Sequence, residues 1–304
     1  MASRIRYARL ATERANPRSL ALDLLSPRSI VALMNREDRR AVLAVYRVRA
    51  AIASGVALIV TALRGGGRLF FVGAGTSGRL GVIEAAECPP TFGTPPRLVQ
   101  AIIAGGRGAV FRSREGAEDD ERAARRAVRT RVRRGDVVVG ISASGVTPFV
   151  RAALEVARRR GAATVLITCN PRGLGRLADQ VRIAPATGPE VLAGSTRLKA
   201  GTATKLVLNT LTTASMTGLG RIYGNRMVDL QPRSAKLRAR ALRVIADLAE
   251  VSPRRALQAF EGSGGRVRIA IVMARNGGDA AEATRALEAA GGSLRVVLQK
   301  LRRK

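Results

Sequence analysis

Two turns in the sequence combine glycine with hydroxyl side chains, a combination that can bind a phosphate group. The first turn, Gly73–Gly81, follows an apolar run at 69–72 that is typical of a buried strand, and it leads into a helical pattern. Backbone N–H groups at such a strand-to-helix turn can approach an anion closely. Gly75, Thr76 and Ser77 are therefore candidate phosphate-binding residues.

The glycine spacing of this turn also matches the G-x-G-x-x-G fingerprint of dinucleotide-binding folds. Those folds place a carboxylate on the ribose about 20 residues further on, at the end of the second strand. The second predicted strand ends here in Ala104-Gly105-Gly106, without an acidic residue. The hydroxyl groups of Thr76 and Ser77 suit a compact phosphate monoester better than a pyrophosphate. We therefore expect a monoester, with a dinucleotide or a plain tight turn as the alternatives.

The second turn, Ser142–Pro148, follows the third predicted strand and supplies the candidates Ser142, Ser144 and Thr147. Ligands of open parallel sheets bind beyond the carboxyl ends of the strands, so we expect the two turns to converge there. Hydroxyl groups and helix N-termini can stabilise a phosphate without lysine or arginine. A simple hydroxyl-rich helix cap is the alternative, but it accounts poorly for two such turns.

The elements that must position these turns alternate between strands and helices. This alternation, with near-continuous apolar strands, predicts a doubly wound, mainly parallel five-stranded α/β sheet covered on both faces. Strands are predicted over 68–73, 97–103, 136–142, 163–169 and 181–184, and helices over 77–88, 116–134, 147–160 and 201–219. A helical pattern capped at Asn35 runs to Leu63, and after Pro232 the pattern is wholly helical.

The pattern predicts three regions: an N-terminal arm and helix at 1–57, the sheet domain at 58–222 and a small helical domain at 232–304. Two segments of the last region, 259–268 and 286–295, repeat at a spacing of 27 as helix, Gly-Gly and helix. We expect a small bundle there that packs or dimerises, and we find no catalytic pattern in it.

Composition narrows the chemistry and the partners. The formal charge is +31, but only five of the 53 basic residues are lysine and the arginines are spread over most predicted helices. With 3% aromatic residues and no basic tail, this favours a solvated arginine-rich surface over a specific nucleic-acid site. Histidine is absent, so acid–base catalysis would have to use other side chains. No cofactor and no metal are expected.

The cell location follows from the cysteines and the apolar stretches. Cys88 and Cys169 lie far apart and lack metal-ligand spacing, which fits reduced thiols in a cytoplasm. The longest uncharged apolar stretch, 50–63, is too short for a bilayer, and no signal peptide is visible, so we expect no membrane association.

The two turns resemble the phosphosugar-binding turns of the SIS (sugar isomerase) domain. Three further blocks at 86–93, 115–119 and 194–203 resemble the N-acetylmuramic acid 6-phosphate etherase family, which is related to glucokinase regulatory protein. The resemblance covers almost the whole chain. It implies an SIS-type sheet, a UBA-like C-terminal domain, a cytoplasmic homodimer and a phosphosugar substrate.

The resemblance also implies the reaction, a lyase cleavage of the D-lactyl ether of N-acetylmuramic acid 6-phosphate in cell-wall recycling. By position in the family motifs, Glu87 matches the proton donor to lactate and Glu118 the proposed base, while Glu84 and Asp119 are nearby alternatives. Two carboxyl groups in different protonation states can perform this chemistry without histidine or metal. Arg197 and Lys199 are candidates to contact the lactyl carboxylate. The alternative is that they pair with other residues of the protein for structural reasons.

Two other functions are compatible with these motifs. A non-catalytic phosphosugar-binding regulatory protein is the chief alternative, and an aldose–ketose isomerase would share the phosphate turns. The chain also departs from the family pattern at Arg14, Val146 and Thr204, which bears on substrate affinity more than on reaction type.

Overall fold

The structure, a computed structural model, describes residues 10–171 and 179–302. These residues form two compact units. The first contains the described residues up to Ala86 together with Arg97–Ser215. The second contains Glu87–Pro96 together with the residues from Met216 onward.

The first unit is built on one parallel sheet whose five strands lie in the order β2-β1-β3-β4-β5. All four neighbouring pairs of strands are parallel, which confirms the prediction of a doubly wound α/β sheet. The strands form where apolar residues run without interruption, and β1 and β3 are buried along their whole length. Their bounds are β1 Leu69–Gly73, β2 Val99–Ile103, β3 Val137–Ile141, β4 Ala163–Ile167 and β5 Val181–Ile183.

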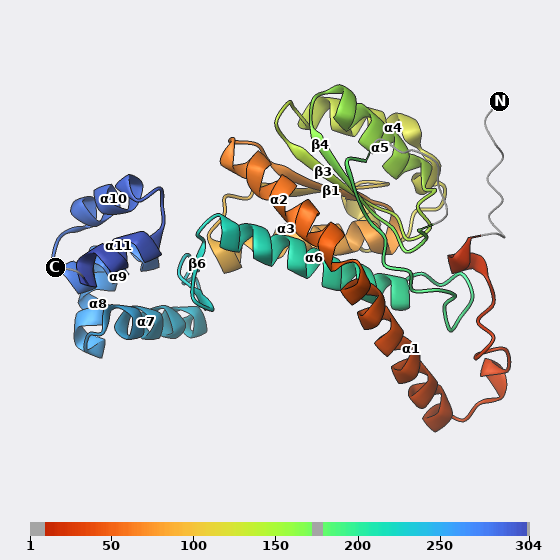
Figure 1. The fold of residues 1–304 in the computed structure, drawn as a ribbon, viewed down its shortest axis with the longest axis horizontal. Coiled ribbons are helices and arrows are strands. Elements are labelled where there is room, and N and C mark those ends of the chain that lie inside the picture. The colour runs from red at the N-terminus through yellow and green to blue at the C-terminus, as the bar shows by residue number, and fades with distance from the viewer. Residues whose placement is uncertain (1–9, 172–178, 303–304) are drawn as a thin grey trace. The chain divides into compact units, whose positions relative to one another are not determined.

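Helices cover both faces of this sheet (Figure 1). On one face, α4 and α5 pack over Phe70, which belongs to their core cluster. On the other face, α3 approaches so closely that a Cβ on Gly81 would lie 2.8 Å from Phe71 Cβ. Neighbouring residues of β1 thus serve opposite faces, as the strand period of two requires. The helix bounds are α2 Arg49–Arg64, α3 Gly75–Phe92, α4 Glu121–Arg131, α5 Pro148–Arg159 and α6 Lys199–Gly218.

Helix α1, Pro27–Arg47, begins earlier than the sequence predicted. The cap is Ser26, whose Oγ accepts a hydrogen bond from the backbone N of Ser29, and Pro27 occupies the first helical position. The predicted start at Asn35 is wrong, because it lies inside a continuous helix. A bend of 59° separates α1 from α2. Within 10–171 and 179–302 no helix alone could cross a membrane, although this bent pair meets the length and composition test together.

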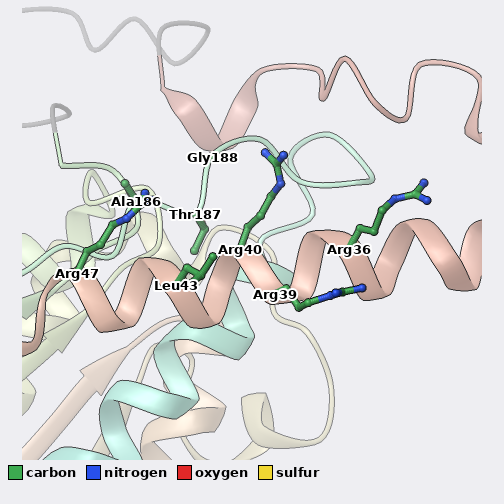
Figure 2. Close-up of a pocket in the computed structure, with 8 residues that line it drawn as sticks. All are labelled: Arg36, Arg39, Arg40, Leu43, Arg47, Ala186, Thr187 and Gly188. Atoms are coloured by element: carbon green, nitrogen blue, oxygen red, sulfur yellow. The ribbon is translucent and has the colours of Figure 1, made fainter.

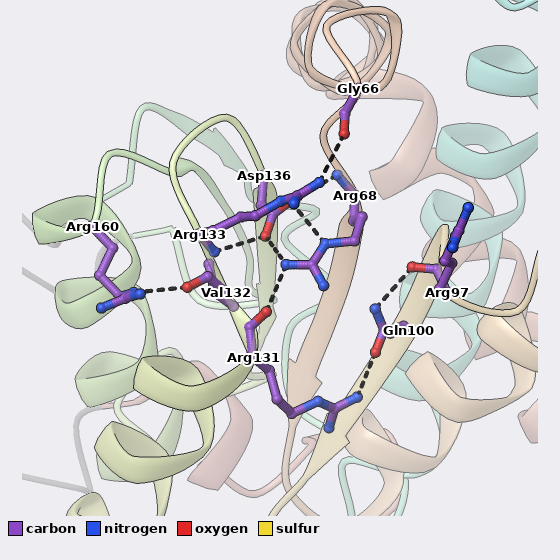
Figure 3. Close-up of polar contacts among 9 residues, drawn as sticks. All are labelled: Gly66, Arg68, Arg97, Gln100, Arg131, Val132, Arg133, Asp136 and Arg160. Carbon is purple, nitrogen blue, oxygen red and sulfur yellow. Dashed lines mark hydrogen bonds and ion pairs between the residues drawn. The ribbon is translucent and has the colours of Figure 1, made fainter.

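Arginines tie the loops together at the N-terminal ends of β1 and β3 (Figure 3). Asp136 is fully buried and accepts hydrogen bonds from the backbone N and the Nη2 of Arg68, at 2.9 and 2.7 Å, and from the backbone N of Arg133 at 2.8 Å. Arg160 Nε donates to the carbonyl oxygen of Val132 at 2.7 Å. Part of the arginine content therefore has a structural use, at the sheet edge opposite the two hydroxyl-rich turns.

The second unit is helical, as predicted, apart from a short hairpin of β6 Ile222–Tyr223 and β7 Arg226–Met227. The repeated segments are α8, Gly264-Gly265, α9 and then α10, Gly291-Gly292, α11. Apolar side chains from all five helices share one core. The bounds are α7 Ala235–Ala249, α8 Pro253–Gly262, α9 Val267–Asn276, α10 Ala280–Ala289 and α11 Leu294–Arg302.

Candidate active site

The first turn offers an open position beside backbone N–H groups. Helix α3 begins at Gly75, directly after β1, and Gly75 has φ +53°, a conformation that favours glycine. A Cβ at this position would meet nothing within 4 Å. The turn thus leaves space in which an anion can approach the start of a helix. Thr76 and Ser77 follow in the first turn of α3 and are half-buried.

The second turn is held by its own hydroxyl groups. Ser142 Oγ lies 2.8 Å from Thr147 Oγ1 and accepts a hydrogen bond from the backbone N of Gly145 at 3.0 Å. Ser144 Oγ accepts from the backbone N of Val146 at 3.3 Å. Thr147 is the N-cap of α5 but makes no side-chain cap hydrogen bond. The N–H groups that begin α5 are therefore not satisfied by that residue.

The two turns start side by side. Strands β1 and β3 are neighbours, and Gly73 at the end of β1 lies opposite Ile141 at the end of β3. The predicted convergence of the two turns is therefore confirmed. Both helices that follow, α3 and α5, begin at this edge, so both direct the positive ends of their dipoles toward it.

Glu118 lies on the same cavity as the first turn. A cavity of about 270 Å³ is lined by residues that include Gly75, Arg79, Arg114 and Glu118. Glu118 is exposed and belongs to a short 3-10 turn, Ala117–Asp119, which packs against α5.

The helix that the sequence placed over 116–134 begins later, at Glu121. The cause is Asp120, whose Oδ1 accepts the backbone N–H of Ala123 at 2.8 Å and so caps α4. Glu118 and the alternative Asp119 therefore lie before the helix, on the 3-10 turn, and both are exposed.

Two arginines of the cavity were missed by the sequence analysis. Arg79 lies one helical turn after Gly75 in the glycine motif itself, and Arg114 directly precedes the block that contains Glu118. Arg79 Nε donates a hydrogen bond to the carbonyl oxygen of Val110 at 2.8 Å, which fixes the neighbouring loop. Both guanidinium groups favour a negatively charged ligand in this cavity.

Glu87 does not line this cavity. It is exposed on α3, which continues through Pro89 and Pro90 to Phe92. The predicted end of this helix at residue 88 is therefore too early. The helix ends instead at Gly93, which has φ +62° and whose backbone N donates to the carbonyl oxygen of Pro89 at 3.0 Å. Each proline lacks an N–H and so removes one helical hydrogen bond, to the carbonyl group of Ala85 or Ala86.

The neighbouring carboxyl group of Glu84 has a structural position. It is 4% exposed, one of its oxygens binds the ammonium group of Lys205, and the other accepts from Thr212 Oγ1 at 2.8 Å. With both oxygens occupied, Glu84 is not placed to exchange protons with a substrate.

Lys199 is buried in an ion pair with Glu37 of α1, and these residues are only 2% and 1% exposed. Asn16 Nδ2 also donates to Glu37, at 2.9 Å. Burial raises the pKa of the Glu37 carboxyl, but the hydrogen bonds from Lys199 and Asn16 outweigh burial, so the pKa is lowered overall. The structure thus shows the structural pairing that was the alternative for Lys199, whereas Arg197 is exposed on the loop before α6.

Glu190 is a buried structural residue that the sequence analysis missed. Its two carboxylate oxygens accept the backbone N–H groups of Lys199 and Ala200 at 3.0 and 2.9 Å. Burial raises the pKa of Glu190, and these two hydrogen bonds oppose the shift. The start of α6 is therefore satisfied by the protein itself, whereas Thr147 gives the start of α5 no side-chain cap hydrogen bond.

A wider hollow of about 710 Å³ lies between α1 and the loop after β5. Four arginines line it, and Figure 2 shows that their side chains leave α1 in different directions. Its lining residues include no carboxyl group that could act as acid or base: Arg36, Arg39, Arg40, Leu43, Arg47, Ala186, Thr187 and Gly188. This hollow therefore fits the expected arginine-rich surface better than a catalytic site.

Comparisons with known proteins agree on an SIS-domain fold and on one family of relatives. Residues 51–158 match the family described as glucokinase regulatory protein N-terminal SIS domain, and residues 117–214 match the SIS domain. Curated relatives named N-acetylmuramic acid 6-phosphate etherase include those of Gloeobacter violaceus, 52% identical over 97% of this chain and 96% of the relative, and Microcystis aeruginosa, 50% identical over 95% of each. That of Geobacillus thermodenitrificans is 49% identical over 95% of this chain and 99% of the relative.

Proposed function

The chain belongs to the N-acetylmuramic acid 6-phosphate etherase family, and we propose that it cleaves the D-lactyl ether of N-acetylmuramic acid 6-phosphate. The products are N-acetylglucosamine 6-phosphate and D-lactate, and the reaction serves the recycling of cell-wall amino sugars. The observation that carries this function is the identity of about half of all residues with relatives of that name, over almost the full length of both chains.

The phosphate group is held at the two converging turns. Gly75, Thr76 and Ser77 supply backbone N–H and hydroxyl groups from the first turn, and Ser142, Ser144 and Thr147 supply hydroxyl groups from the second. The open space at Gly75 and the absence of a side-chain cap hydrogen bond from Thr147 at the start of α5 support this assignment. Two helix dipoles add to the attraction for the anion.

The bond to lactate is broken by elimination. In the open-chain sugar the C1 aldehyde acidifies the C2 proton, so a base removes that proton and the C3–O bond to lactate breaks. An acid delivers a proton to the departing lactate oxygen, and a C2=C3 double bond forms. Water then adds at C3 and a proton returns to C2, which leaves the C3 hydroxyl of the product.

Two carboxyl groups take these proton-transfer roles. We assign the base to Glu118, because it matches the base in the family motif and lines the cavity that begins at Gly75; Glu115 lines the same cavity but does not match that motif position. We assign the proton donor to Glu87, which matches the acid in the family motif; Glu84 is unsuited because Lys205 and Thr212 occupy its oxygens.

The lactyl carboxylate requires a basic partner. The exposed side chain of Arg197 is the favoured one, because Lys199 would have to leave its buried pair with Glu37. Arg79 and Arg114, which line the cavity with Glu118, contribute further positive charge.

The active form is a homodimer. Three apolar residues on one face of α1 support this assembly: Val31, Val42 and Tyr46 are 59%, 53% and 63% exposed. Such a row of large apolar side chains is typical of an interface and unfavourable in water. Light scattering after size exclusion should give twice the monomer mass, and Val42→Glu should lower it toward the monomer.

We propose that the protein lies in the cytoplasm. Both of its cysteines, Cys88 and Cys169, are buried and reduced, which is the usual state of thiols in that compartment.

The function is tested by incubating the purified protein with N-acetylmuramic acid 6-phosphate and measuring D-lactate with a lactate dehydrogenase. N-acetylmuramic acid without the phosphate is the matched control and should be a much poorer substrate. Binding of the phosphosugar without any lactate release would favour the alternative, a regulatory phosphosugar-binding protein, which the match at residues 51–158 also allows.

A further inference from the structure

The segment that carries Glu87 belongs to the second unit. By their contacts, residues Glu87–Pro96 group with the C-terminal helices, whereas the first part of α3 up to Ala86 groups with the sheet. The boundary between the units thus falls inside one helix, directly before the proposed proton donor. Contacts that hold residues Glu87–Pro96 within the second unit therefore also affect the position of Glu87.

A close backbone contact inside this unit joins Gly93 to Asp229. Gly93 has φ +62°, and a Cβ there would overlap the carbonyl oxygen of Asp229 and lie 3.1 Å from its Cβ. A position of this kind accepts glycine because any side chain would be strained and would collide with the backbone opposite. The end of the Glu87 segment therefore rests directly on Asp229.

The Asp229 side chain is held by two arginines. Its carboxylate is 15% exposed and binds Arg268, and Arg221 Nη1 lies 3.2 Å away. Arg268 also donates to the carbonyl oxygens of Gly292 at 2.6 Å and Gly220 at 3.2 Å. One guanidinium group thus connects the start of α9, the end of α10 and the segment before β6 to Asp229.

Side chains do not enclose the contact between Gly93 and Asp229 on every side. A hollow of about 510 Å³ borders Gly93, Asp229, Arg221 and Arg268 on one side. Where side chains do not fill the space, directional ion pairs and hydrogen bonds define the position of the backbone. Loss of the Asp229 carboxylate should therefore release the segment at Gly93.

We propose that Asp229 is a positioning residue, which through Gly93 fixes the segment that carries Glu87. This inference rests on the proposed function and on the role of Glu87 in it. The proposal also gives the second helix–Gly-Gly–helix repeat a role, because its Gly292 carbonyl oxygen accepts a hydrogen bond from Arg268.

The two proton transfers should respond differently to a change at Asp229. Glu118 belongs to the first unit, so removal of the C2 proton does not depend on the Asp229 contact. Glu87 belongs to the second unit, so delivery of a proton to lactate does. A misplacement of about 1 Å can reduce a rate about 100-fold.

The experiment uses the full chain with N-acetylmuramic acid 6-phosphate in heavy water and follows two rates by NMR. These are D-lactate release and deuterium incorporation at C2 of unreacted substrate. For Asp229→Asn we expect lactate release to fall about 100-fold while C2 exchange persists, and Asp229→Glu should recover part of the release. Asp247→Asn is the matched control, since Asp247 pairs with Arg226 on the exposed surface of the same unit and should leave both rates unchanged.

The outcomes separate the inference from the function. Absence of lactate release by the unchanged protein would contradict the proposed function itself. With an active protein, unchanged lactate release in Asp229→Asn, or a parallel fall of release and exchange in a folded variant, would overturn the inference. If Asp229→Asn does not fold, Gly93→Ala replaces it, because that change disturbs the same contact while retaining the ion pairs, and the same split between the rates is required.

Discussion

Replacing Lys199 with methionine should destabilise the fold, and should not act mainly on substrate affinity. The Lys199 ammonium is 2% exposed and pairs with Glu37, which is 1% exposed. Removing one partner of a buried ion pair costs about 3–5 kcal/mol, because the remaining charge is left buried without its counterion. Asn16 and Arg40 still contact Glu37, so we expect the lower end, about 3 kcal/mol.

Thermal unfolding followed by circular dichroism measures this cost. For units of 150–250 residues, 1 kcal/mol shifts Tm by about 2–4 °C, so Lys199→Met should lower Tm by about 6–12 °C. The exposed Lys236 provides a matched control, and Lys236→Met should leave Tm almost unchanged. A double variant, Glu37→Gln with Lys199→Met, should lose less than the sum of the single losses, because the two residues interact.

The same pair predicts a dependence on pH. Because the folded-state pKa of Glu37 is lowered, its ionised form contributes stability above the ordinary carboxyl pKa of about 4.5. This contribution is lost as the pH falls through the folded-state pKa. The Tm difference between the unchanged protein and Glu37→Gln should therefore be large at pH 7 and shrink below about pH 4.5. If Lys199→Met kept its Tm and raised KM instead, Lys199 would be a substrate ligand and the structural account would be refuted.

Three further predictions concern the sheet edge, the phosphate turn and a thiol. Asp136→Asn should cost about 3–5 kcal/mol in urea unfolding, because an amide cannot accept every hydrogen bond that the buried carboxylate accepts, whereas Glu155→Gln, at a half-exposed pair, should cost under about 1 kcal/mol. A small loss for Asp136→Asn would show that the Arg68 network is dispensable. Ser142→Ala should raise KM for the phosphosugar about tenfold with a smaller change in kcat, since one hydrogen bond to a charged group is worth about 1.5–3 kcal/mol; an unchanged KM would move the phosphate elsewhere. Burial raises the pKa of the Cys169 thiol to about 12, so a thiol reagent at pH 8 should label it only after unfolding, and rapid labelling of the folded protein would contradict its burial.

The sheet was predictable from sequence because its strands carry their own signal. Short continuous apolar runs such as 137–141, which are rich in β-branched residues, favour buried strands, and this run is followed by a turn rich in glycine and hydroxyl groups. The two hydroxyl-rich turns were recognisable for the same reason, since each lies directly after a strand end. Local patterns therefore predicted the strands and the two turns that follow β1 and β3.

Helix ends and long-range pairs were less predictable. The start of α1 was misplaced because Asn35 and Ser26 are both good caps, and the helix uses Ser26 with Pro27 at its first position. The end of α3 was misplaced because two prolines fit a last helical turn when a glycine follows.

The long-range pairs carry no local signal at all. Glu37 pairs with Lys199 across 162 residues, and Glu190 satisfies the start of α6 from a loop. In the sequence these side chains look like ordinary charged surface residues. Only the fold shows that they are buried and structural, and that Glu115 and Glu118 both line the cavity beside the first hydroxyl-rich turn.

The central claim is most directly tested by the fate of the C2 hydrogen during one complete reaction. N-acetylmuramic acid 6-phosphate is incubated in heavy water with the unchanged protein, and the sugar product is examined by NMR. The account predicts D-lactate together with N-acetylglucosamine 6-phosphate that carries one deuterium at C2, and loss of both with Glu118→Gln. Lactate formed with the C2 hydrogen retained would contradict the elimination mechanism, and full activity of Glu118→Gln would contradict the proposed base.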